Sequence, residues 1–144
     1  MKKLWLMAIF FAQSALAQMP NLEIFHEGAA TEAVAEKMGQ AMFNDLLSNS
    51  ETIEKMSEQE VVHYIMDSMK QYSGEMVEAM KQDCSVNNPA KDCACFYDKV
   101  DMNVLFDEIK ILAGNPDLKE EEVEKELSPI MEKFESQKKQ CGLK

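Results

Sequence analysis

The side chains with the most obvious capacity for chemistry are four cysteines: Cys84, Cys93, Cys95 and Cys141. Such a set could form two structural disulfides, a redox-active dithiol at Cys93 and Cys95, or a zinc site. A thioredoxin-type dithiol has two residues between its cysteines, but only Ala94 separates this pair. The spacing is also wrong for the ligands of a structural zinc ion. We therefore favour structural disulfides.

The spacing of the cysteines ranks the three possible pairings. A bond between Cys93 and Cys95 would close a small, strained ring. Cys84 should end one helix, and Pro89 suits the first position of the next, so in the resulting hairpin Cys93 lies nearer to Cys84 than Cys95 does. Two residues along a helix correspond to a rotation of about 200°, so neighbouring cysteines should serve different partners. We favour Cys84–Cys93 with Cys95–Cys141 over the swapped pairing.

The first part of the chain predicts export, which decides how the cysteines are interpreted. Lys2 and Lys3 precede an apolar stretch that ends in Ala15-Leu16-Ala17, as in a secretory signal peptide over residues 1–17. The stretch is shorter than the ~20 residues that cross a bilayer, so we expect cleavage after Ala17 and not a membrane anchor. No later segment is long and apolar enough to span a membrane. We expect a protein of the bacterial periplasm or a secreted protein, where disulfides form.

Methionine is the unusual component, with 12 residues in 144. Three pairs recur at helical spacing and so share helix faces: Met38/Met42, Met66/Met69 and Met76/Met80. Thioethers suit Cu(I), but methionine also fills irregular cores and lines adaptable grooves. Core filling is the favoured interpretation. A partner groove lined by Met66, Met69, Met76 and Met80 comes second and copper third, so we expect no metal and no cofactor.

No arrangement of residues indicates catalysis. The two histidines, His26 and His63, accompany no recognisable nucleophile motif and no His-Glu-x-x-His zinc motif. Among 26 acidic residues no pair is marked out as an acid–base couple. We expect a protein that is not an enzyme.

The charge of the chain restricts its partners. The net charge is -11 and every basic residue is lysine, which argues against nucleic acid as a partner. The densest charge run contains five glutamates: Glu120, Glu121, Glu122, Glu124 and Glu126. This run is either a solvated helix face or an acidic docking face for a basic protein. We expect a protein that binds a protein partner, as an inhibitor, immunity-type or chaperone-like accessory protein; the alternative is periplasmic copper binding or thiol–disulfide redox chemistry.

Apolar periodicity predicts how these residues are positioned. It indicates an all-α bundle of five or six helices over residues 31–144, stapled by two disulfides, behind a flexible or loosely docked segment at 18–30. A capping box at Ser57–Glu60 should start the longest apolar stripe, with a break at Ser73-Gly74. The segment 104–112 is apolar most of the way round and predicts a central buried helix. Pro129 predicts a bend or split in the last helical region, with Ser128 capping its second part.

Overall fold

The computed structural model describes residues 24–115 and 117–144, and this part of the chain contains helices and no strands. The helices are α2 (Ala29–Ser48), α3 (Ser50–Ile53), α4 (Glu58–Lys70), α5 (Ser73–Cys84), α6 (Ala90–Tyr97), α7 (Met102–Ala113) and α8 (Glu120–Gln140). The prediction of a small all-α domain with two disulfides is confirmed. The signal peptide predicted at residues 1–17 lies outside the described residues.

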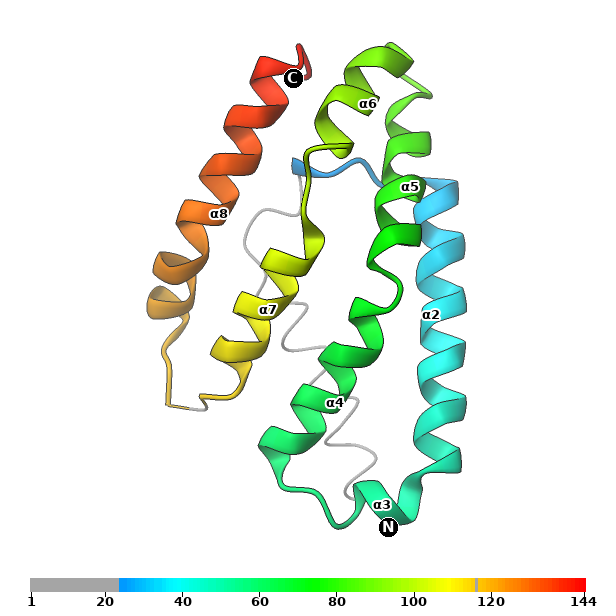
Figure 1. Ribbon diagram of the computed structural model, residues 1–144, viewed down its shortest axis with the longest axis vertical. Helices are drawn as coiled ribbons and strands as arrows, with labels where there is room; N and C mark the ends of the chain where they lie inside the picture. The colour runs from blue at the N-terminus through cyan, green and yellow to red at the C-terminus, as the bar shows by residue number, and fades with distance from the viewer. Residues whose placement is uncertain (1–23, 116) are drawn as a thin grey trace.

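The helices form a bundle in which α4 and α5 follow each other through the middle (Figure 1). Helix α2 packs along α5 and touches α4, α7 packs against α4, and α8 lies beside α7. Helix α6 folds back against α5, and the chain ends near α6. Among the described residues, no helix is long and apolar enough to cross a membrane.

The apolar stripe that the sequence predicts behind Ser57 is divided between two helices. The capping box is confirmed, because the Glu60 backbone N–H donates to Ser57 Oγ at 3.3 Å and Ser57 N–H donates to Glu60 Oε2 at 2.7 Å. Helix α4 ends at Lys70 and α5 begins at Ser73, so the break falls directly before the Ser73-Gly74 position that we predicted.

The last helix corrects one part of the prediction of a bend or split at Pro129, because α8 is not split there. Helix α8 runs unbroken through this proline. Ser128 is not an N-cap, because its hydroxyl donates to the Glu124 carbonyl one turn earlier at 2.7 Å. A proline removes one backbone donor from a helix, and the buried side chains of Leu127 and Phe134 on either side hold both halves of α8 to the core.

The segment before α2 corrects the prediction that residues 18–30 are loosely docked, as far as the described residues reach. Ile24 and Phe25 are buried in the core. The Phe25 ring lies 5.7 Å from the ring of Phe134 and 6.4 Å from that of Phe96, measured between centroids. These contacts give the segment a fixed place between α6 and α8, because an aromatic side chain buries a large apolar area.

Helix α7 lies between α4 and α8, but it is not buried all round, as the prediction of a central buried helix would require. Leu105, Ile109 and Leu112 are buried against the bundle. Val104 and Ile111, seven residues apart and so on one face, remain 50% and 66% exposed. The reason is geometric: neighbouring helices cover only part of the circumference of α7, and nothing among the described residues covers the rest.

Candidate functional site

The structure pairs the four cysteines in the order that the spacing favours. Cys84 is bonded to Cys93 and Cys95 to Cys141, with Cα–Cα distances of 5.9 and 5.6 Å. The first bond closes the hairpin of α5 and α6, and the second ties α6 to the end of α8. The alternative of a dithiol between Cys93 and Cys95 does not arise in this structure, because each is bonded elsewhere and the described residues contain no free cysteine.

The four methionines Met66, Met69, Met76 and Met80 lie in the core or against it. Met66, Met69 and Met80 are buried in the core, and Met76 is partly buried against it. They are buried because the stripe of α4 and α5 faces the helices on both sides of this central pair. A flexible thioether in that position fills space between helices, which supports core filling, the interpretation that the sequence favoured over a partner groove.

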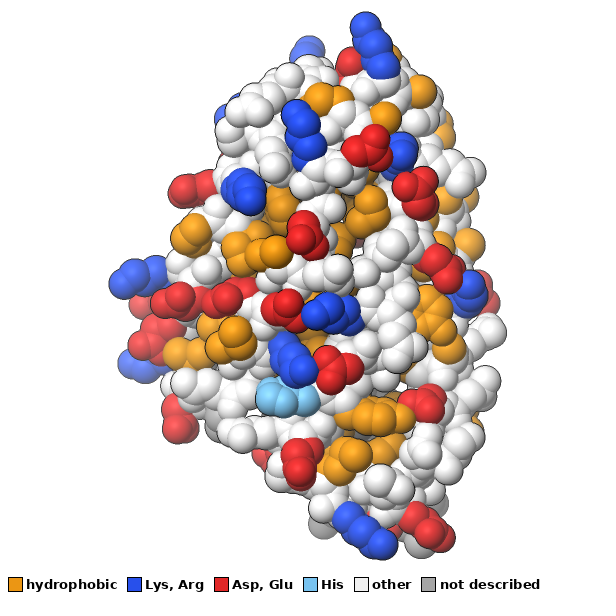
Figure 2. Space-filling model, viewed as in Figure 1, with side chains coloured by type: hydrophobic (Ala, Val, Ile, Leu, Met, Phe, Trp, Pro, Cys, Tyr) orange, Lys and Arg blue, Asp and Glu red, His pale blue; other side chains and the backbone are white. Residues whose placement is uncertain are grey.

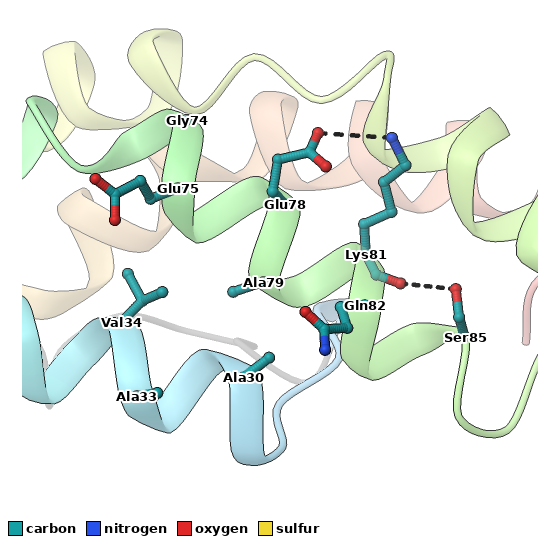
Figure 3. Close-up of a pocket in the computed structure, with 10 residues that line it drawn as sticks. All are labelled: Ala30, Ala33, Val34, Gly74, Glu75, Glu78, Ala79, Lys81, Gln82 and Ser85. Atoms are coloured by element: carbon teal, nitrogen blue, oxygen red, sulfur yellow. Dashed lines mark hydrogen bonds and ion pairs between the residues drawn. The ribbon is translucent and has the colours of Figure 1, made fainter.

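A hollow lies instead between α2 and α5, with a volume of about 780 Å³. Figure 3 shows Ala30, Ala33 and Val34 of α2 facing Glu75 and Ala79 of α5 across it. The hollow follows from the small size of the alanines, which carry no distinctive sequence signal. For this reason sequence analysis did not find it.

The charges around this hollow are already paired within the protein. Lys37 lies 2.7 Å from Glu75, and Lys81 lies 3.5 Å from Glu78 and 2.9 Å from Asp98. Hydrogen bonding to Glu75 raises the pKa of Lys37, and hydrogen bonding to Asp98 raises the pKa of Lys81. The hollow therefore offers little free charge to a ligand.

The predicted acidic docking face is exposed at the start of α8. All five glutamates are exposed: Glu120, Glu121, Glu122, Glu124 and Glu126. Glu122 accepts a hydrogen bond from the Lys119 backbone N–H at 3.0 Å. Within the described part of the chain, the side chains of the other four form no ion pair and no hydrogen bond. Four carboxylates thus remain available to an external partner.

Hydrophobic side chains reach the surface beside these carboxylates. Figure 2 shows acidic side chains gathered at the edge where α8 begins, with hydrophobic ones lying among them. Val104 and Ile111 are exposed on α7, the helix that packs beside α8, and the exposed Asp107 lies on the same face between them. Sequence analysis missed the exposure of Val104 and Ile111 because it expected a central buried helix.

The best-organised polar contacts lie near the disulfides. The Tyr97 hydroxyl accepts a hydrogen bond from the His26 backbone N–H at 2.8 Å and lies 2.7 Å from His26 Nδ1. Burial raises the pKa of Tyr97 to about 12, so its hydroxyl stays protonated and can donate to a neutral imidazole. Burial and the positive charge of Lys138 lower the pKa of His26. This pair fixes the segment before α2 to α6.

Asp83 of α5 organises the start of α2 in a similar way. Its carboxylate accepts hydrogen bonds from the backbone N–H groups of Ala30 at 3.0 Å and Thr31 at 2.8 Å, and from the Thr31 hydroxyl. Burial works against the charge of Asp83, but these hydrogen bonds outweigh it and lower its pKa. A Cβ atom on Gly28 would lie 3.0 Å from this carboxyl group, so glycine leaves room for the contact. The arrangement is an N-cap supplied by another helix.

No group of three histidine, cysteine, aspartate or glutamate side chains among the described residues is arranged to hold a metal ion. Comparisons with known proteins brought no match to a protein-family model, a curated protein or a solved structure.

Proposed function

We propose that this protein is exported and acts by binding a basic protein partner, without catalysing a reaction. The observation that carries the proposal is the surface of α7 and the first turns of α8. There, glutamates without partners in the described chain lie on the helix beside the exposed Val104 and Ile111. Such a combination suits recognition: charge speeds and orients the encounter, and apolar contact retains the partner.

The electrostatic part of the proposal rests on the whole chain as well as on this surface. With a net charge of -11, the protein repels acidic macromolecules and attracts basic ones over distances of about 10 Å at moderate salt. Residues 117–126 alone contain six acidic and two basic side chains. An inhibitor, an immunity-type protein or a chaperone-like accessory protein would use such a surface against a lysine-rich or arginine-rich partner.

Two features support export. The leader-like residues 1–17 would direct the chain across a membrane, and all four cysteines are engaged in disulfides. Intact mass measurement of the protein from its native host tests this part. We expect a chain that begins at Gln18 and lacks four hydrogens. A full-length chain with four reduced thiols would contradict export.

The binding surface is tested by capture from the host's envelope or culture-medium extract, with the tagged protein as bait at low and at high salt. We expect a basic protein whose capture falls about tenfold in Glu121→Gln/Glu124→Gln and again in Ile111→Ser, because the first removes attraction and the second removes apolar contact. The double variant Glu32→Gln/Glu36→Gln is the matched control, since it removes the same charge from exposed positions on α2. Capture that is indifferent to salt and equal in all variants would refute the proposal.

A further inference from the structure

The two disulfides lie in very different surroundings. Cys84 and Cys93 are both 0% exposed, so their bond is enclosed by the core. Cys141 is 6% exposed, and Cys95 is only partly buried. Because a disulfide exchanges only with a thiol that can reach it, the structure makes the Cys95–Cys141 bond the accessible one.

A positive charge lies beside this accessible bond. Lys99, one turn after Cys95 in the sequence, places its Nζ atom 3.9 Å from Cys95 Sγ. The attacking species in disulfide exchange is a thiolate, and its negative charge spreads over the sulfurs during the reaction. An ammonium group at this distance attracts the thiolate and stabilises that charge. Among the described residues, the Cys84–Cys93 bond has no cation within hydrogen-bonding distance of its sulfurs.

We propose that Cys95 is a site of S-thiolation, where a small-molecule thiol exchanges with the Cys95–Cys141 disulfide of the folded protein. The thiolate of the small molecule attacks Cys95 Sγ and forms a mixed disulfide there. The bond between the two protein sulfurs breaks, and its electron pair goes to Cys141 Sγ, which takes a proton from water. A second thiol molecule attacks the mixed disulfide, releases Cys95 as a thiolate beside Lys99, and leaves as a disulfide of the small thiol.

The rest of the fold holds during the exchange. Cys141 follows the last residue of α8. The side chains of Leu127 and Phe134 keep α8 in the core, and the Cys84–Cys93 bond keeps α5 on α6. The exchange therefore frees the residues that follow α8, including Leu143, which is buried in the closed form.

The test exposes the native oxidised protein to reduced glutathione, followed by alkylation of free thiols and peptide mapping by mass spectrometry. We expect glutathione on Cys95 and the alkyl group on Cys141, with Cys84 and Cys93 still bonded to each other. Lys99→Met should slow adduct formation about threefold or more, because it removes the charge beside the sulfur. Lys91→Met is the matched control: it removes an exposed lysine from α6, the helix that contains Cys95, and should leave the rate unchanged.

Four results would overturn the proposal. The first is modification of Cys84 or Cys93 at the same rate as Cys95, and the second is an adduct on Cys141 in place of Cys95. The third is exchange that occurs only after denaturant is added, and the fourth is equal slowing by the two lysine variants. A neutral thiol, 2-mercaptoethanol, serves as a second probe. If access and Lys99 decide the outcome, this thiol must also react at Cys95 before it reacts at Cys84 or Cys93. None of these readouts depends on a binding partner, so the proposal stands or falls separately from the proposed function.

Discussion

The end of the molecule that contains the disulfides differs in construction from the opposite end, where α2 leads into α3 (Figure 1). At the first end, Cys84, Cys93, Phe96 and Tyr97 are the most deeply buried of the described side chains. At the second, Ile53 of α3 is the buried side chain, and Leu47 near the end of α2 is 50% exposed. None of the side chains of α2, all of them within the described residues, is fully buried.

The polar contacts of α2 and of the segment before it follow the same division. Near the disulfides, hydrogen bonds join residues 52 to 71 positions apart, through Asp83 and Thr31 and through His26 and Tyr97. At the other end, the Tyr64 hydroxyl donates to Asp45, a residue only 19 positions away. Helix α2 is therefore fixed at its start and held loosely towards its end. Its last turns should open more often than its first, because local opening is easiest where few groups are buried.

The largest effect is expected when the Cys95–Cys141 disulfide is removed. In Cys95→Ala/Cys141→Ala, the free energy of unfolding should fall by about 4 kcal/mol in the chain-entropy model, because the bond restricts a long loop of the unfolded chain. Denaturant unfolding measures the loss. Amide exchange in the last turns of α2 should change little, since those turns open without the disulfide end. If the free energy of unfolding falls by less than about 1 kcal/mol, the stability of the disulfide end does not depend on the Cys95–Cys141 bond.

A smaller effect is expected where the two regions meet at the start of α2. Asp83→Ala leaves the first backbone donors of α2 without an acceptor and should cost about 1 kcal/mol of unfolding free energy. Amide exchange in the first turn of α2 should become faster and approach the rate in the last turn. Asp98→Ala is the control, because Asp98 takes part only in an exposed ion pair with Lys81 and should cost less than about 0.5 kcal/mol. Equal losses would show that the cap contributes nothing.

The smallest effect is a dependence on pH at the disulfide end. The folded protein holds the pKa of His26 below the ordinary histidine value of about 6.5, so near that pH the unfolded chain binds a proton more readily than the folded one. The contribution of His26 to stability is therefore complete above the unfolded pKa and is lost as the pH falls towards the folded pKa. Protonation also places a hydrogen on Nδ1, where the Tyr97 hydroxyl had donated.

Unfolding free energies at about pH 8 and about pH 5 measure this loss. In His26→Gln the difference between the two values should be smaller than in the parent, because the titrating group is gone. If His26→Gln keeps the parent's difference, the contact between His26 and Tyr97 is not linked to pH.

Sequence analysis succeeded where local spacing decides the outcome. The rotation between Cys93 and Cys95 and the position of Pro89 ranked the disulfides in the order that the structure has. The capping box at Ser57 and Glu60 depends on four consecutive residues and was equally readable. The exposure of the glutamates in α8 follows from their charge.

The remaining features depend on which helix covers which face, and periodicity does not contain that information. The apolar residues of segment 104–112 predicted a central buried helix. The arrangement of the neighbouring helices, which the sequence does not reveal, leaves Ile111 at the surface. Phe25 stands in a segment without a period, and its burial depends on aromatic rings that are distant in sequence. The methionines of α4 and α5 share faces as predicted, but the position of the two helices in the middle of the bundle puts those faces in the core.

The contact between Thr31 and Asp83 also bears on the order in which the protein is assembled. The ribosome releases α2 long before Asp83, which follows Thr31 by 52 residues. An amphipathic segment with an uncapped start is only marginally helical in water, so α2 should be among the last of the described helices to settle. The chain would then nucleate around α5 and α6, where contacts are close in sequence, and α2 would dock onto a surface formed by helices that are synthesised after it.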